Sequence, residues 1–234
     1  FNLADVILSD KAFNRDIFYL WFKFKDKDKE SVKRIAQAAI DETDNERKAN
    51  LLYFFNATHN QYTAPEEFPL DVTPLVKWIE NEIYHISDKP LSRITESVLQ
   101  ILEFKRQNIS RKVGLKMFYD ERFSSGLGRY YAMSLRFGVN YSPDEDKADL
   151  IALLRSPNAD DRNNAIFIFI RDIHLGVEDL PLEMIPHVFA NIQSDWNRHT
   201  FCKTLIEKGL FPEELEDECL YDYNKHTRNL FLKT

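Results

Sequence analysis

The amino-acid sequence predicts an all-α protein built as a solenoid of stacked helical hairpins. Apolar residues recur at spacings of three and four, and the 234 residues include only six glycines and nine prolines, which is typical of helices. Arginines also recur at intervals of 30 to 46 residues, each at the start of an expected helix: Arg15, Arg47, Arg93, Arg129, Arg162, Arg198 and Arg228. A period of this length indicates repeats that bury their apolar faces against their neighbours.

Turn and capping residues divide the chain into helices that pair around these arginines. Asp160 and Asp195 are expected N-caps of second helices, since aspartate accepts from free N–H groups there. Prolines lie between helices or at their starts, where the missing N–H costs nothing. After an N-terminal segment and a helix over 11–24, the expected pairs are 30–41 with 44–59, 71–87 with 90–106, 109–121 with 126–137, 143–155 with 159–174, 181–193 with 195–209, and 212–222 with 225–234. The longest connector is 60–70, and we expect one elongated domain over 1–234.

Three of these units resemble the HEAT repeat. In 149–168, a leucine-rich first helix leads into a turn with proline and aspartate, then Arg162, then a small residue that enters an apolar second helix. The stretch 38–52 around Arg47 follows the same order, and 188–198 is a weaker copy. The resemblance implies a right-handed α-α superhelix of the HEAT/armadillo type with about six helical hairpins.

The same resemblance implies a structural role for the arginines. In HEAT repeats the turn aspartate and the arginine form a ladder between adjacent repeats, which here would join Asp44 with Arg47, Asp160 with Arg162, and Asp195 with Arg198. A guanidinium suits this role because it can donate to helix-terminal carbonyls and to a neighbouring carboxylate. The alternative, arginines that bind phosphates, is disfavoured because the adjacent caps place them at the seam between repeats.

The second helices should build the concave surface of the solenoid. Positions one and nine residues after the repeated arginines are often polar: Lys48, Asn56, Asn163, Arg171, His199 and Glu207. These side chains would line a curved strip that suits a protein or peptide ligand.

Charge and composition narrow the class of partner. The formal net charge of -7 repels nucleic acid and anionic membranes and favours a basic protein partner. For the acidic run from Glu213 to Asp222 the favoured interpretation is the polar cap that a last repeat needs, and a binding surface for such a partner is the alternative. Apolar stretches reach about five residues, against the roughly 20 that a membrane span needs. Two cysteines are too few for a disulfide framework, so we expect a cytoplasmic protein.

The window from Glu103 to Arg136 is a candidate nucleic-acid surface in this acidic chain. It contains eight basic and three acidic residues, with aromatic residues between them, and such surfaces neutralise phosphates and stack bases. The candidates are Lys105, Arg106, Arg111, Lys112, Lys116 and Arg122. The favoured alternative is that the aromatic residues belong to the core and the lysines to a solvated face.

No pattern in the sequence indicates an enzyme, a metal site or a cofactor. The six histidines are dispersed and none has zinc-ligand spacing. Cys202 follows His199 by three residues, but a packed core thiol is the favoured interpretation. Some HEAT-like solenoids are DNA glycosylases with an aspartate beside tryptophans. The pair Asp195-Trp196 and the stretch 78–80 are the comparable pairings here, and they match no motif.

The preferred hypothesis is therefore a non-catalytic protein-interaction scaffold, such as an adaptor, an assembly factor or an acidic inhibitor of the immunity type. The alternative is a nucleic-acid-binding or DNA-repair protein that uses the 103–136 window. A third possibility is a structural segment of a larger assembly.

Overall fold

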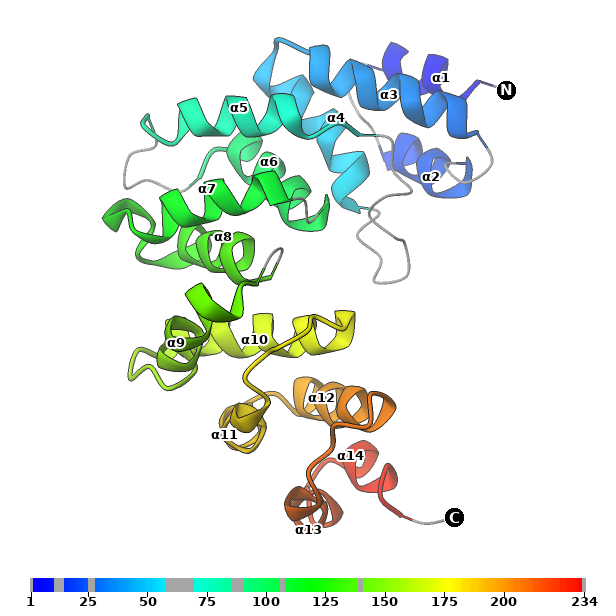
Figure 1. Ribbon diagram of the computed structural model, residues 1–234. Coiled ribbons are helices and arrows are strands. Elements are labelled where there is room, and N and C mark those ends of the chain that lie inside the picture. Colours follow the sequence, from blue (N-terminus) through cyan, green and yellow to red (C-terminus); the bar gives the residue numbers. More distant parts are fainter. Residues whose placement is uncertain are drawn as a thin grey trace. The chain divides into compact units, whose positions relative to one another are not determined.

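The computed structural model describes residues 2–10, 15–24, 28–57, 70–85, 91–105, 108–138 and 141–232. The chain divides into two compact units, unit 1 over 1–140 and unit 2 over 141–234 (Figure 1). The described residues contain helices and no strand, which confirms the all-α class. A right-handed superhelix of about six hairpins, forming one domain, stays a prediction. The predicted connector 60–70 lies outside the described residues except for Leu70.

Unit 1 consists of packed helices that follow the predicted ranges closely. Its elements are α1 (Leu3–Ser9), α2 (Arg15–Phe24), α3 (Lys29–Asp41), α4 (Asn45–Ala57), α5 (Thr73–Glu82), α6 (Arg93–Lys105), α7 (Asn108–Phe118), the 3-10 turn η2 (Glu121–Phe123) and α8 (Gly126–Phe137). Helix α3 packs on α1 and α4, α6 packs on α4, α5 and α8, and α7 packs on α5 and α8. Helix α1 lies in the segment for which no helix was predicted.

Two kinds of contact hold the core of unit 1 together. Aromatic side chains pack between α2 and α4, and the backbones of α7 and α8 approach each other closely. The indole of Trp21 on α2 packs against Phe54 and Phe55 on α4, with ring centroids 5.4 and 5.5 Å away. Between α7 and α8, Gly114 allows the two backbones to meet. A Cβ at this position would lie 2.6 Å from the main-chain nitrogen of Arg136.

Unit 2 consists of three consecutive helical pairs. They are α9 (Pro143–Leu154) with α10 (Ala159–Leu175), η3 (Leu182–Met184) and α11 (Ile185–Asn191) with α12 (Asp195–Glu207), and η4 (Glu213–Leu215) and α13 (Glu216–Leu220) with α14 (Lys225–Asn229). The second helices α10, α12 and α14 pack side by side, and the first helices lie on the other side of the unit (Figure 1).

Each second helix of unit 2 begins with a side-chain cap. Asn158, Ser194 and Asn224 accept hydrogen bonds from backbone N–H groups two or three residues later. Asp160 and Asp195 were predicted as the caps, and both predictions are wrong. The first cap lies two residues before Asp160, and the second lies one residue before Asp195. Asparagine and serine cap as well as aspartate does, so the choice depends on where the turn places the first helical residue.

None of the helices in the described part of the chain combines the length and the apolar content that crossing a bilayer requires.

Candidate functional site

The repeated arginines of unit 2 make the same bond in each helical pair. The guanidinium groups of Arg162, Arg198 and Arg228 donate to main-chain carbonyls 2.7, 3.0 and 2.6 Å away, each six residues upstream. These acceptors belong to Ser156, Ile192 and Asp222, which follow the ends of the first helices. Because carbonyls at helix ends lack intrahelical partners, each arginine fixes the turn between its two helices and points into the pair.

Arg198 also joins two successive pairs. Its Nη1 lies 3.1 Å from Oδ2 of Asp222, whose side chain is 1% exposed. Asn224 donates to the main-chain carbonyl of Asp195 at 3.2 Å, so two bonds link α12 to the segment before α14. The residue that pairs with Arg198 is therefore Asp222, which sequence reasoning had placed only in the acidic run. Asp160 donates through its backbone N–H to the side chain of Asn158.

In unit 1 the arginines reach more distant partners. Arg47 donates to the carbonyl of Leu8 at the end of α1, at 2.8 Å, and its Nε lies 2.8 Å from Glu42. The carboxylate of Asp44 accepts instead from the backbone N–H of Arg47, at 2.7 Å, and so caps α4. Arg129 donates to the carbonyl of Phe118 across η2. The side chain of Arg15 lies outside the described residues.

Two arginines of the predicted nucleic-acid surface are bound within unit 1. Arg111 donates to the main-chain carbonyl of Arg136 at 2.8 Å. Arg122 pairs with Asp120 at 2.6 Å and donates to the carbonyl of Tyr84. The hydrogen bond from Arg122 lowers the pKa of Asp120 below its ordinary value, because it stabilises the charged carboxylate.

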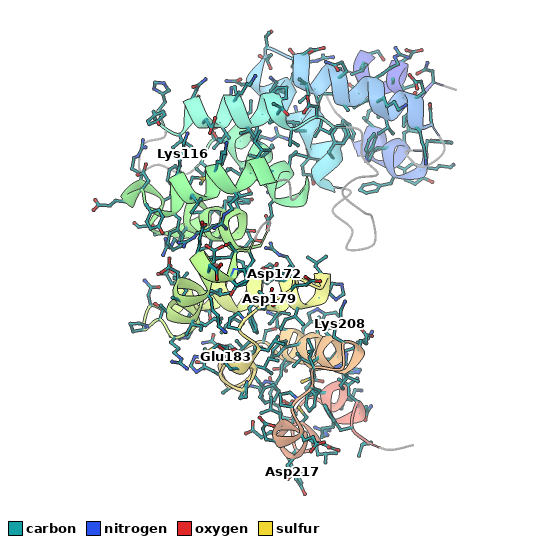
Figure 2. All side chains as sticks on the ribbon, viewed as in Figure 1. Lys116, Asp172, Asp179, Glu183, Lys208 and Asp217 are labelled. Atoms are coloured by element: carbon teal, nitrogen blue, oxygen red, sulfur yellow. The ribbon has the colours of Figure 1, made fainter. Side chains whose placement is uncertain are left out.

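The lysines of this window differ in their surroundings. Lys112 and Lys116 on α7 are both exposed, and Lys116 (Figure 2) also forms an ion pair with Glu80 at 3.1 Å. The predictions for Arg106 and for the side chain of Lys105 lie outside the described residues.

Aromatic residues of the window pack with its arginines. The guanidinium carbons of Arg129 and Arg136 lie 4.3 and 4.4 Å from the ring centroid of Phe118. Arg136 is buried, so this stack belongs to the interior of unit 1. An aromatic ring held between two cations in this way is unavailable for stacking with a base.

The predicted strip residues lie at the surface to different degrees. Asn163 on α10 and Glu207 on α12 are exposed, and Lys48, Arg171 and His199 are half-buried. The side chain of Asn56 lies outside the described residues.

Large apolar side chains lie beside these polar ones, and sequence reasoning missed them. Trp196 is 73% exposed, Phe167 is 48% exposed and Ile206 is 41% exposed. They occur at helical spacing with the polar positions, so each helix carries one surface stripe. We call this set the second-helix face: Asn163 and Phe167 on α10, and Trp196, His199, Lys203 and Ile206 on α12.

The second-helix face has a regular arrangement, because equivalent positions follow the arginines of adjacent helices. Asn163 and His199 each come one residue after the arginine, and Phe167 and Lys203 each come five residues after it. The ring centroids of Trp196 and His199 are 6.3 Å apart, and those of His199 and His226 on α14 are 6.0 Å apart. The stripe on α12 therefore continues onto the start of α14.

A separate open hollow of about 560 Å³ lies where α10 and α12 end. Apolar side chains form part of its lining, together with Glu178, Asp179, Glu183 and Lys208 (Figure 2). Glu183 is bonded to Lys147 at 3.0 Å, and this hydrogen bond lowers the pKa of Glu183. Because Lys147 already balances the charge of Glu183, the hollow is a weaker candidate for a binding site than the second-helix face.

The described residues contain no group of three histidine, cysteine, aspartate or glutamate side chains that could hold a metal ion. No model of a protein family, no curated protein and no solved structure matches this chain.

Proposed function

We propose that this protein is a non-catalytic interaction scaffold that binds a protein or peptide along the second-helix face. The observation that carries the proposal is Trp196, an indole exposed over 73% of its surface on an ordered helix. Tryptophan is enriched among the residues that dominate binding energy at protein interfaces. Phe167 and Ile206 add two further exposed apolar side chains to the second-helix face, and exposed apolar surface is typical of an interaction site.

The other side of α12 supports this interpretation because it holds the helix rigidly. Phe201, Cys202 and Leu205 are completely buried, and Arg198 bonds both to Ile192 and to Asp222. A partner that docks on such a helix need not spend binding energy on ordering it.

Charge supports a basic protein as the partner. The net charge is -7, and Glu216, Asp217 and Glu218 on α13 are exposed. The net charge would attract basic residues of a partner to the chain from a distance. These three acids lie on a first helix and are not part of the second-helix face. The HEAT-like superhelix and the absence of enzymatic activity remain part of this proposal.

The test replaces the indole. Trp196→Ala should weaken binding of a captured protein partner at least about tenfold, because the anchor of the face is lost. Full-length tagged protein would capture partners from a cell lysate, mass spectrometry would identify them, and calorimetry would measure the affinity of each purified partner. The circular dichroism spectrum should not change, since an exposed side chain contributes little to folding.

Tyr221→Ala is the matched control, because Tyr221 is an even more exposed aromatic residue that follows α13 and lies off the second-helix face. It should bind the same partners with unchanged affinity. Equal affinity of wild type and Trp196→Ala would refute the proposal. Tight, salt-sensitive binding of DNA or RNA that Lys112→Glu abolishes would favour the nucleic-acid alternative instead.

A further inference from the structure

The two cysteines of the chain meet inside unit 2. Cys202 on α12 and Cys219 on α13 are both free and completely buried, and their Sγ atoms are 3.6 Å apart. A disulfide bond is about 2.05 Å long, so the sulfurs would have to approach each other by about 1.5 Å. A rotation of the side chains with a small shift of one helix supplies a movement of that size.

We propose that Cys202 and Cys219 are a redox-sensitive staple, which closes as a disulfide and locks the α13–α14 pair onto α12. In the closing step a disulfide oxidant such as oxidised glutathione accepts two electrons from the two thiols. One S–S bond forms in the protein, the S–S bond of the oxidant breaks, and the two thiol protons pass to the two glutathione thiols released. Reduced glutathione reverses the step.

The disulfide would lie where it can control how firmly the α13–α14 pair packs on α12. Helices α13 and α14 have five residues each, and isolated helices shorter than about 12 residues are marginal in water. Their helical state therefore depends on packing against α12. The polar links across this contact are the ion pair of Arg198 with Asp222 and the bond from Asn224 to Asp195. A covalent bond between α12 and α13 would oppose local opening of the α13–α14 pair.

The environment of the thiols controls how the staple reacts. The hydrogen bond with Cys219, and secondly burial, raise the pKa of the Cys202 thiol. The reactive thiolate is therefore scarce while the reduced α13–α14 pair is packed on α12. Both sulfurs are also shielded from an oxidant. Oxidation should therefore proceed through local opening of the α13–α14 pair.

The experiment equilibrates the full chain in buffers of varied ratios of reduced to oxidised glutathione, under native conditions and in concentrated urea. Free thiols are then blocked by alkylation and counted by mass spectrometry. We expect a native monomer that lacks two hydrogens and carries a peptide crosslink between Cys202 and Cys219. The ratio of reduced to oxidised glutathione at which half of the pair is oxidised should be about a hundredfold higher for the native chain than for the unfolded chain. A disulfide that closes a loop of this length favours folding by about that factor, so folding favours the disulfide by the same factor.

Three results would overturn the proposal. They are two free thiols at every ratio in the native protein, mixed disulfides or dimers as the main products, and equal ratios for the native and unfolded chains. These readouts use wild type alone, so they do not depend on whether a variant folds.

Hydrogen exchange of residues 210–232 provides the second readout. Oxidation of wild type should slow exchange there at least about tenfold, because the staple opposes local opening. In Cys202→Ser and in Cys219→Ser the same oxidant should leave exchange unchanged. Equal slowing in the serine variants would show that the oxidant acts elsewhere and would also overturn the proposal.

Discussion

Units 1 and 2 stabilise similar helical pairs by contacts of different range. In unit 2 each repeated arginine bonds to a carbonyl six residues upstream, so each pair fixes its own turn. In unit 1 Arg47 reaches Leu8, 39 residues upstream, and Arg129 reaches Phe118, 11 residues upstream. The arginine–carbonyl bonds of unit 2 thus stay within each helical pair, whereas Arg47 in unit 1 bonds to a carbonyl of α1, outside its own pair.

Unit 1 also buries a polar network that joins two of its helices. The carboxylate of Glu103 on α6 accepts from the hydroxyls of Tyr130 and Ser134 on α8, at 2.7 and 2.6 Å. Glu103 and Ser134 are both buried. Buried polar groups are costly when they lose a partner, so α6 and α8 must keep their register.

The largest effect is expected at Gly114 on α7. In Gly114→Ala the new Cβ would lie 2.6 Å from the nitrogen of Arg136 and 2.7 Å from the carbonyl carbon of Leu135. Backbone atoms cannot yield as a flexible side chain can, so we expect a net loss of more than about 3 kcal/mol from overpacking. This net loss already includes the about 1 kcal/mol by which the higher helix propensity of alanine favours the variant. Urea unfolding followed by circular dichroism measures the difference.

Gly126→Ala is the control for Gly114→Ala. Its Cβ would meet nothing within 4 Å, but its φ of 59° is unfavourable for alanine, which should cost about 1 to 2 kcal/mol. A loss at Gly114 no larger than that at Gly126 would show that the close approach of α7 and α8 is unimportant.

The next largest loss of stability is expected at one of two arginines of unit 2, and the other serves for comparison. Arg198→Ala leaves the carboxylate of Asp222 buried without this ion pair, which should cost about 3 kcal/mol. Arg162→Ala removes a bond to the neutral carbonyl of Ser156, which should cost about 1 kcal/mol. Urea midpoints of the two variants test the order of these losses. Equal losses would mean that the link from Arg198 to the next helical pair adds nothing to the bond within its own pair.

Local signals explain what the sequence could predict of this fold. The expected helix over 143–155 corresponds to α9 at Pro143–Leu154, and that over 159–174 to α10 at Ala159–Leu175. Prolines, caps and apolar spacing lie within a few residues of the boundaries that they specify. Helix α1 was missed because its seven residues are too few for a recognisable apolar period.

The site was less predictable because it depends on how the pairs stack. Polar positions such as Asn163 and His199 follow from their spacing to the arginines. Trp196 could not be predicted as exposed, since a large apolar residue on a helix is normally a core residue. The contacts of Arg198 with Asp222 and of Cys202 with Cys219 join residues 24 and 17 positions apart, and no local pattern specifies such pairs.

The smallest effect expected is a difference in the acid sensitivity of the two units. Among the carboxyl groups that the structure describes in unit 1, hydrogen bonds lower the pKa of Asp28 through Ser31, of Asp71 through Thr73, and of Asp120 through Arg122. Among the described carboxyl groups of unit 2, the pKa is lowered at Glu183, through Lys147. These side chains are at least partly exposed, so each contributes little.

The direction of this effect follows from the lowered pKa values. Such a carboxyl group stabilises the fold above its ordinary pKa of about 4, and the contribution is lost as the pH falls through the lowered folded value. Unit 1 should therefore lose more resistance to urea than unit 2 between about pH 5 and about pH 3. Asp120→Asn tests this, with Glu183→Gln as its counterpart in unit 2. The stability gap between wild type and Asp120→Asn should narrow as the pH falls, because protonation removes the same charge that the substitution removes. A gap of constant size would show that Asp120 acts through packing and not through its charge.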